Sequence, residues 1–306
     1  MANDVLSLID LDQPEAGYRR FISCWVLQAT GINLVVDPGP SRSIPFLVGR
    51  LRELGVERLD LVLLTHIHLD HGGGAADLLG AFPGARVFCH ASGVKHLQEP
   101  EKLWQGSVKT IGAIAEMYGR PKPVPPASFA TEADLAAAGV EVIPTPGHAP
   151  HHLSFRVRDL LFAGEAIATR MELPGGREYL RPATPPRFEL DVALSSMGAL
   201  SALEPEPPRV LLAHHGETAG LRALIRRARA QLLRWIELSR EVRCGTPQGP
   251  EPGWVEEVFV RLLQDDPAFG QGAFQALPED IQARERYYVQ NSIRGLLGCL
   301  SEKPRA

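Results

Sequence analysis

Cysteine is scarce in this sequence. There are four cysteines in 306 residues, and none of them forms a C-x-x-C pair. The chain therefore lacks the ligand pattern of a zinc ribbon and the dense cysteine pattern of a disulfide framework. The amino terminus also has no cationic segment followed by an apolar one, so no secretory signal is expected. We predict reduced, buried thiols and a cytoplasmic location.

Long hydrophobic runs and an excess of one charge are also missing. No stretch approaches the roughly 18 consecutive apolar residues that a membrane span needs. Lys plus Arg number 32 and Asp plus Glu number 36, which gives a formal net charge of −4. Nothing in this balance attracts nucleic acid or an anionic membrane, so neither partner is expected. Hydrophobic residues at 44% and charged residues at 22% are ordinary for a globular protein.

The pattern of apolar residues divides the chain into an α/β domain over residues 1–218 and a helical extension over residues 219–306. Seven apolar runs predict strands: Ile32–Val36, Leu61–Leu64, Arg86–Cys89, Glu141–Ile143, Leu153–Val157, Leu160–Ala163 and Val210–Ala213. Helical spacing from Leu221 predicts an amphipathic helix whose arginines face water. We expect a linker at 244–253, helices at Trp254–Leu263 and Ile281–Leu300, and a loop at 173–186.

One cluster of polar residues carries chemistry. Residues 65–74 read THIHLDHGGG and follow a predicted strand. In an extended chain, His66, His68 and Asp70 project to the same side, and His71 turns inward as the chain enters a helix. Imidazole nitrogens and carboxylate oxygens are ligands for divalent metals such as zinc. Chance would produce this pattern in about 5 of 10,000 chains of this composition, so we predict a metal site.

These residues resemble the signature of the metallo-β-lactamase-fold hydrolases, and four further motifs agree with it in order. Asp37 lies in VVDPG, His148 in TPGH, Glu165 in FAGE and His214 in LLAHHG. The resemblance implies a four-layer αβ/βα sandwich with two divalent ions, most simply zinc, with iron or manganese as alternatives. It implies that His148 joins His66 and His68 on one ion, while His214 joins Asp70 and His71 on the other. Asp37 would not bind an ion itself but would orient residues that do.

Two positions depart from the family pattern. Glu165 stands where the family usually has an aspartate that bridges both ions. The tandem His214-His215 leaves the last ligand open, because adjacent side chains of an extended segment point in opposite directions. We favour His214, with His215 near the substrate or behind the ligand. His151 and His152 are not assigned as ligands, and Arg181 or Arg187 could hold an anionic group of the substrate.

The implied reaction is hydrolysis of a small ester, thioester or lactone, as in the glyoxalase II-like and lactonase-like branches of the family. Two ions about 3.5–4 Å apart would ionise a shared water, and Asp70 would orient it and move its proton. No G-x-S-x-G motif or activated cysteine offers a second catalytic system. The alternatives are a non-heme iron oxidoreductase and a non-catalytic, metal-stabilised binding module. The expected partner is a small-molecule substrate, and the sequence leaves room for a homodimer.

Overall fold

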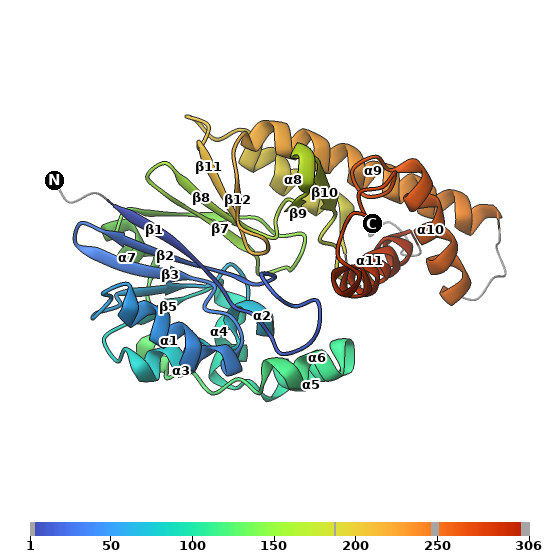
Figure 1. Cartoon of the computed structure of the whole chain (residues 1–306). Coiled ribbons are helices and arrows are strands. Elements are labelled where there is room, and N and C mark those ends of the chain that lie inside the picture. The colour runs from blue at the N-terminus through green and yellow to red at the C-terminus, as the bar shows by residue number, and fades with distance from the viewer. Residues whose placement is uncertain (1–3, 187, 246–250, 301–306) are drawn as a thin grey trace, which may run out of the picture. The chain divides into compact units, whose positions relative to one another are not determined.

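A computed structural model describes residues 4–186, 188–245 and 251–300 (Figure 1). The chain forms two compact units that do not follow a single cut along the sequence. The first unit comprises Met1–Pro144, His151–Gly164 and Pro208–Ala219, and the second comprises Thr145–Pro150, Glu165–Pro207 and Gly220–Ala306. The predicted division after residue 218 lies one residue from the last of these boundaries, and as a functional boundary it stays a prediction.

The first unit contains two five-stranded sheets of mixed direction. The first sheet has the order β1-β2-β3-β4-β5, in which β3, β4 and β5 run parallel. Its strands are β1 (Val5–Asp10), β2 (Ser23–Ala29), β3 (Ile32–Val36), β4 (Leu61–Leu63) and β5 (Arg86–Phe88). The second sheet has the order β12-β11-β8-β7-β6. Its strands are β6 (Val140–Pro144), β7 (Leu153–Val157), β8 (Leu160–Gly164), β11 (Arg209–Leu212) and β12 (Glu217–Thr218).

The two sheets share one apolar core. Leu34 and Leu63 from the first sheet belong to the same buried cluster as Phe155, Phe162 and Leu211 from the second. Burial of these side chains is the main favourable contribution to folding of the unit. The α/β sandwich that the sequence predicts is therefore confirmed.

Helices accompany the first sheet. Helices α1 and α3 lie along its outer side (Figure 1), and α1 buries Ile44, Leu47 and Leu51 at helical spacing. The helices of this unit are α1 (Ile44–Glu53), α2 (Leu69–Gly72), α3 (Ala75–Ala81), α4 (Ala91–Gln98), α5 (Glu101–Ile111), α6 (Ala113–Tyr118) and α7 (Glu132–Ala137), with short 3-10 turns at Ser41–Ser43 and Pro126–Ser128.

The second unit is mostly helical. Its elements are β9 (Thr169–Glu172), a 3-10 turn at Pro174–Gly176, β10 (Glu178–Arg181), α8 (Leu190–Ser201), α9 (Leu221–Gly245), α10 (Glu251–Asp265) and α11 (Glu279–Cys299). Strands β9 and β10 form an antiparallel hairpin. Helix α9 buries Leu224, Ala228 and Trp235 and exposes Arg226 and Arg229, as its spacing predicts.

The expected loop at 173–186 is wrong, because β10 lies within it. This segment pairs with β9, a partner that local sequence does not reveal. The expected linker at 244–253 is wrong at both ends, since α9 continues to residue 245 and α10 begins at residue 251. Residues 246–250 lie outside the described residues. No helix within the described residues is long and apolar enough to cross a membrane.

Candidate metal centre

The loop after β4 is anchored by Asp37, which lies at the end of the neighbouring strand β3. One Asp37 carboxylate oxygen accepts the backbone N–H of Thr65 at 2.8 Å, and the other accepts the Thr65 hydroxyl at 2.7 Å. Asp37 is buried and has a φ of +52°, a conformation that aspartate tolerates better than most residues. The carboxylate therefore fixes the backbone just before the first histidine of the loop, which agrees with the supporting role expected for Asp37.

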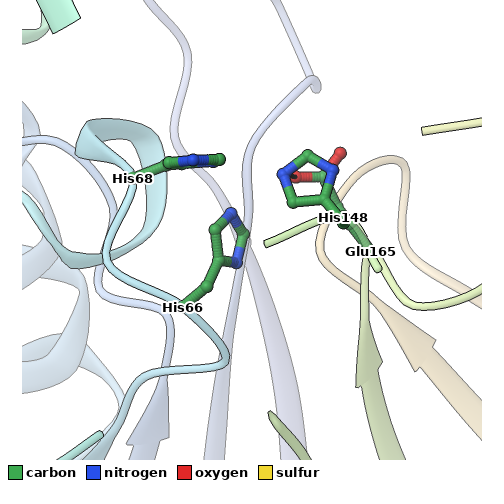
Figure 2. A group of neighbouring side chains, drawn as sticks. All are labelled: His66, His68, His148 and Glu165. Atoms are coloured by element: carbon green, nitrogen blue, oxygen red, sulfur yellow. Dashed lines mark ion pairs between the residues drawn. The ribbon is translucent and has the colours of Figure 1, made fainter. Parts of the chain in front are cut away.

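This anchor also determines the proton position on His66. The Thr65 hydroxyl has one hydrogen, which it donates to Asp37, so it can only accept from the His66 Nδ1 at 3.0 Å. The proton of the neutral ring then lies on Nδ1, and Nε2 carries the lone pair that a metal needs. The His68 ring meets the His66 ring edge-on, with centroids 4.5 Å apart (Figure 2).

Asp70 and His71 lie on the short helix α2 instead of continuing the extended segment. The extended spacing ends at His68, the N-cap of α2, so the expectation that Asp70 projects with His66 and His68 is wrong. Asp70 and His71 instead join His214, and these three residues offer ligand atoms within 4.8 Å of one another. The Asp70 carboxylate lies 3.3 Å from His71 Nε2 and 3.9 Å from His214 Nε2. His71 Nδ1 faces Asp37 at 3.5 Å.

The loop before β2 holds His214 in place. Its Nδ1 lies 2.9 Å from the Phe21 carbonyl oxygen, which can only accept, so Nδ1 is the protonated nitrogen. The Phe21 ring stacks on the His214 ring with centroids 4.2 Å apart. His215, by contrast, has a φ of +61° and is not one of the grouped ligands in the described residues. The structure thus brings His214, the histidine that we favoured, to Asp70 and His71.

His148 and Glu165 lie together in the second unit. His148 Nδ1 lies 2.9 Å from the Ala183 carbonyl oxygen, so Nδ1 carries the proton here as well. Its Nε2 faces the Glu165 carboxylate at 3.1 Å (Figure 2). Gly147, just before His148, has a φ of +147°, and a Cβ there would lie 2.9 Å from Ala193. Glycine is therefore required for the turn that presents His148.

The surroundings of this pair are apolar. A cavity of about 10 Å³, with room for roughly one water, adjoins His148 and Glu165. Its apolar lining includes Ile167, Phe188 and Met197. The absence of bulk solvent from so small a cavity strengthens the electrostatic interactions of the two polar side chains.

Arg181 does not serve the role that the sequence suggested for it. Its guanidinium is buried and donates from Nε to Glu285 at 2.5 Å, so its charge is already paired within the protein. The Tyr179 hydroxyl donates to the same carboxylate at 2.9 Å. Burial, and next the negative charge of Glu285, raise the pKa of Tyr179 well above its usual value, so the phenol stays protonated. Arg187 lies outside the described residues.

His152 is buried, and its ring centroid lies 5.2 Å from that of His66. Gly164 has a φ of +59°, and a Cβ there would come within 2.5 Å of His152 Nε2. The close approach of the ring to this backbone therefore needs glycine. His151 is half-buried. Neither residue belongs to a ligand group in the part of the chain that the structure describes, and neither is predicted from the sequence to be a ligand.

The donor set fits divalent metals. Three of the histidines hold Nδ1 against an oxygen that can only accept from it, and each thereby presents Nε2 as a ligand. This arrangement, an imidazole oriented by a carbonyl or hydroxyl behind it, is typical of metal-binding histidines. Imidazole and carboxylate donors together suit zinc, iron and manganese.

Comparison with known proteins agrees with this geometry. The chain belongs to the metallo-beta-lactamase superfamily, because residues 17–214 match the model of that family. A metallo-beta-lactamase fold-containing protein of Sulfurisphaera tokodaii, ST1585, is 28% identical over 211 residues, which are 65% of this chain and 74% of that protein. A hydroxyacylglutathione hydrolase of Aeromonas salmonicida is 29% identical over 198 residues, which are 65% of this chain and 63% of that protein.

Solved structures share the fold. The crystal structure of ST1585 from Sulfolobus tokodaii covers 95% of this chain and 97% of its own, with a TM-score of 0.63 and 23% identity. A metallo-beta-lactamase family protein of Thermus thermophilus, TTHA1429, covers 96% of this chain and 92% of its own, with a TM-score of 0.63 and 21% identity. At these identities the likeness concerns the fold alone.

Sequence reasoning missed the groups that orient the ligands. Thr65 stands in the motif but was not given a role. The carbonyls of Phe21 and Ala183 orient His214 and His148, although they lie 193 and 35 residues away from them in the sequence. A backbone carbonyl can come from any residue type, so no sequence signal could have identified these two.

Proposed function

We propose that this protein is a hydrolase that binds two divalent ions and cleaves a small ester, thioester or lactone. His66, His68 and His148 bind one ion, and Asp70, His71 and His214 bind the other. Glu165, beside His148, would supply a carboxylate to the first of these ions. The observation that carries the proposal is the grouping of Asp70, His71 and His214 in one buried region of the first unit.

The residues around the site have distinct roles in this proposal. Divalent ions, when bound, supply a Lewis acid for the carbonyl and lower the pKa of water. The chain itself orients the histidines through Thr65, Phe21 and Ala183. Asp70 positions the attacking water and carries its proton toward the leaving group. The apolar cavity beside His148 and Glu165 excludes bulk water from that side.

A thioester is the first substrate class to test. Several relatives that are 28–31% identical are named hydroxyacylglutathione hydrolase, and the chain spans 56–64% of their length. Another relative, from Methanocaldococcus jannaschii, is named a probable metallo-hydrolase; it is 30% identical over 47% of this chain and 68% of that protein. Both names are consistent with hydrolysis.

The test is elemental analysis of protein purified with zinc, manganese or iron, followed by an ester, thioester, lactone and phosphodiester panel. We expect two ions per chain and turnover of at least one substrate class. His68→Ala should lose one ion and most of the activity, whereas His96→Ala, an exposed histidine on α4, should change neither. A wild-type protein that binds no metal or turns over nothing contradicts the proposal.

The same experiment separates the two alternatives. Glu165 is a carboxylate that an iron centre could use, so bound iron with an oxygen-dependent reaction would replace hydrolysis by oxidoreductase chemistry. If His68→Ala lowers the free energy of unfolding while the wild type shows no turnover, the protein is a metal-stabilised binding module.

A further inference from the structure

Helix α11 holds the backbone segment that carries the Ala183 carbonyl. The Ser292 hydroxyl on α11 donates to the Pro182 carbonyl at 3.3 Å, and the Thr184 hydroxyl donates to the Ser292 carbonyl at 3.2 Å. Segment 182–184 is therefore fixed on both sides of Ala183 by one residue of α11.

A buried ionic network fixes the start of the same segment. Glu285 lies two turns before Ser292 on α11, and therefore on the same face of the helix. One of its carboxylate oxygens accepts from Arg181 and Tyr179, and the other accepts from Arg284 at 2.9 Å. Both oxygens thus have partners, and the network is buried. Removal of one partner from such a buried network leaves the remaining charges uncompensated, so the network holds its members in one arrangement.

The α11 backbone also packs directly against the segment. A Cβ placed on Gly295 would lie 2.1 Å from the Pro185 carbonyl oxygen, a distance that no side chain can tolerate. Gly298, one turn later, has its nearest contact at 3.6 Å from the Pro186 carbonyl oxygen, which is ordinary van der Waals distance. The close approach at Gly295 leaves the segment no room to move toward the helix.

We propose that α11 positions the candidate metal ligand His148. Glu285, Ser292 and Gly295 place the 181–185 backbone, and the Ala183 carbonyl then holds the proton on His148 Nδ1 and directs Nε2 toward Glu165. The metal-binding part of this inference rests on the proposed function. The C-terminal helix thus supports a ligand that lies 137 residues before Glu285 in the sequence, and Glu285, Ser292 and Gly295 are positioning residues.

The test compares two glycines on the same helix. Gly295→Ala should push the segment away and lower zinc affinity about 10- to 100-fold, the usual effect of losing a group that orients a ligand. Gly298→Ala should leave zinc affinity within about twofold, because its Cβ finds space. Zinc affinity is measured by competition with a chromophoric chelator, and circular dichroism checks that both variants fold.

A second, milder variant tests the same inference if Gly295→Ala fails to fold. Glu285→Gln keeps the shape of the side chain but replaces one acceptor oxygen with a donor that faces a donor. It should lower zinc affinity in the same direction, whereas Ser239→Ala, a buried serine of α9 that bonds only within its own helix, should not. Nitrogen-15 histidine spectra, with His148→Gln for assignment, report the His148 Nδ1–H group, whose resonance should show a weakened hydrogen bond to the Ala183 carbonyl in both α11 variants.

The outcomes separate this inference from the proposed function. Folded Gly295→Ala and Glu285→Gln proteins with wild-type zinc affinity and a wild-type His148 Nδ1–H resonance overturn the role of α11. A wild type that binds no zinc or other divalent metal overturns the proposed function instead. The Nδ1–H resonance of His148, measured in metal-free protein, still decides whether α11 orients His148.

Discussion

Asp37 in the first unit and Asp266 in the second are both buried carboxylates that accept hydrogen bonds from backbone N–H groups and from side chains. Asp37 accepts from Thr65 and faces the candidate ligand His71. Asp266 accepts from Trp235, Gln231 and two backbone N–H groups at residues 268 and 269, none of which is a candidate ligand. A buried carboxylate that accepts several hydrogen bonds therefore supports a candidate metal site in one unit and the packing of helices in the other.

These two carboxylates allow effects on stability to be separated from effects on site geometry. A buried donor that loses its acceptor costs about 1–3 kcal/mol wherever it lies. Only Asp37 passes this effect to the ligands, because Thr65 stands between it and His66. Stability measurements alone cannot tell the two carboxylates apart, whereas stability and metal content measured together can.

The largest effect on stability should come from Asp266→Ala. Four donors lose their acceptor, and we expect the free energy of unfolding to fall by about 3–5 kcal/mol. Urea unfolding gives the change, and zinc per folded chain should stay as in the wild type. Asp265→Ala is the matched control: its carboxylate is exposed and pairs with Arg234 at 3.4 Å, so its removal should cost at most about 1 kcal/mol. Loss of zinc from folded Asp266→Ala protein would contradict the claim that Asp266, unlike Asp37, does not affect the metal site.

Asp37→Ala should lower stability by about 2–4 kcal/mol, because the backbone N–H and hydroxyl of Thr65 lose their acceptor. It should also reduce zinc per chain, since the His66 tautomer is no longer held. Asp60→Ala is the control within the same unit: Asp60 accepts a backbone N–H from Asn33 at 2.8 Å but contacts no candidate ligand. The Asp60→Ala protein should be less stable than the wild type but should bind the same amount of zinc per chain. An Asp37→Ala protein that keeps full zinc would contradict the anchoring role.

Alkaline pH should weaken the first unit through its buried thiols. Burial raises the pKa of Cys89 from 9.0 to about 12. The thiol is neutral in both states below pH 9, so its effect on stability begins there and grows as the pH rises toward 12. The decline should reach about 1.4 kcal/mol per pH unit within this window. In pH-dependent urea unfolding, Cys89→Ala should reduce this decline, and the rest should persist because burial also raises the pKa of Cys24. Cys244→Ala, an exposed position in the second unit, should leave the decline unchanged.

The smallest effect should come from the cap of α7. The Thr131 hydroxyl accepts from the Asp134 N–H at 3.2 Å, and Asp134 accepts from the Thr131 N–H at 2.6 Å. This reciprocal capping box stabilises only the first turn of the helix. Thr131→Ala should cost about 1 kcal/mol with no change in zinc content. Thr110→Ala, within helix α5, should leave thermal stability the same or slightly higher, because alanine is the better helix former.

Local sequence predicted much of the first unit. The runs Ile32–Val36 and Leu153–Val157 become strands with those bounds, because their side chains suit a buried sheet position. Strand β2 was missed because five of its seven residues are buried on both faces, which removes the alternation that marks a strand. Strand β10 was missed because its pairing partner, β9, and not its own composition, makes it a strand.

The order and chemical type of the candidate ligands follow from the sequence alone, because imidazole and carboxylate donors at the spacing of residues 66–71 indicate a metal site whatever the rest of the fold. Tertiary structure decided which ring nitrogen each of His66, His148 and His214 presents. It also decided which histidine of the tandem pair joins Asp70, and that α11 contacts the segment whose carbonyl faces His148. The physical reason is that these choices depend on hydrogen-bond acceptors such as Phe21 and Ala183, which reach the rings only after distant segments pack.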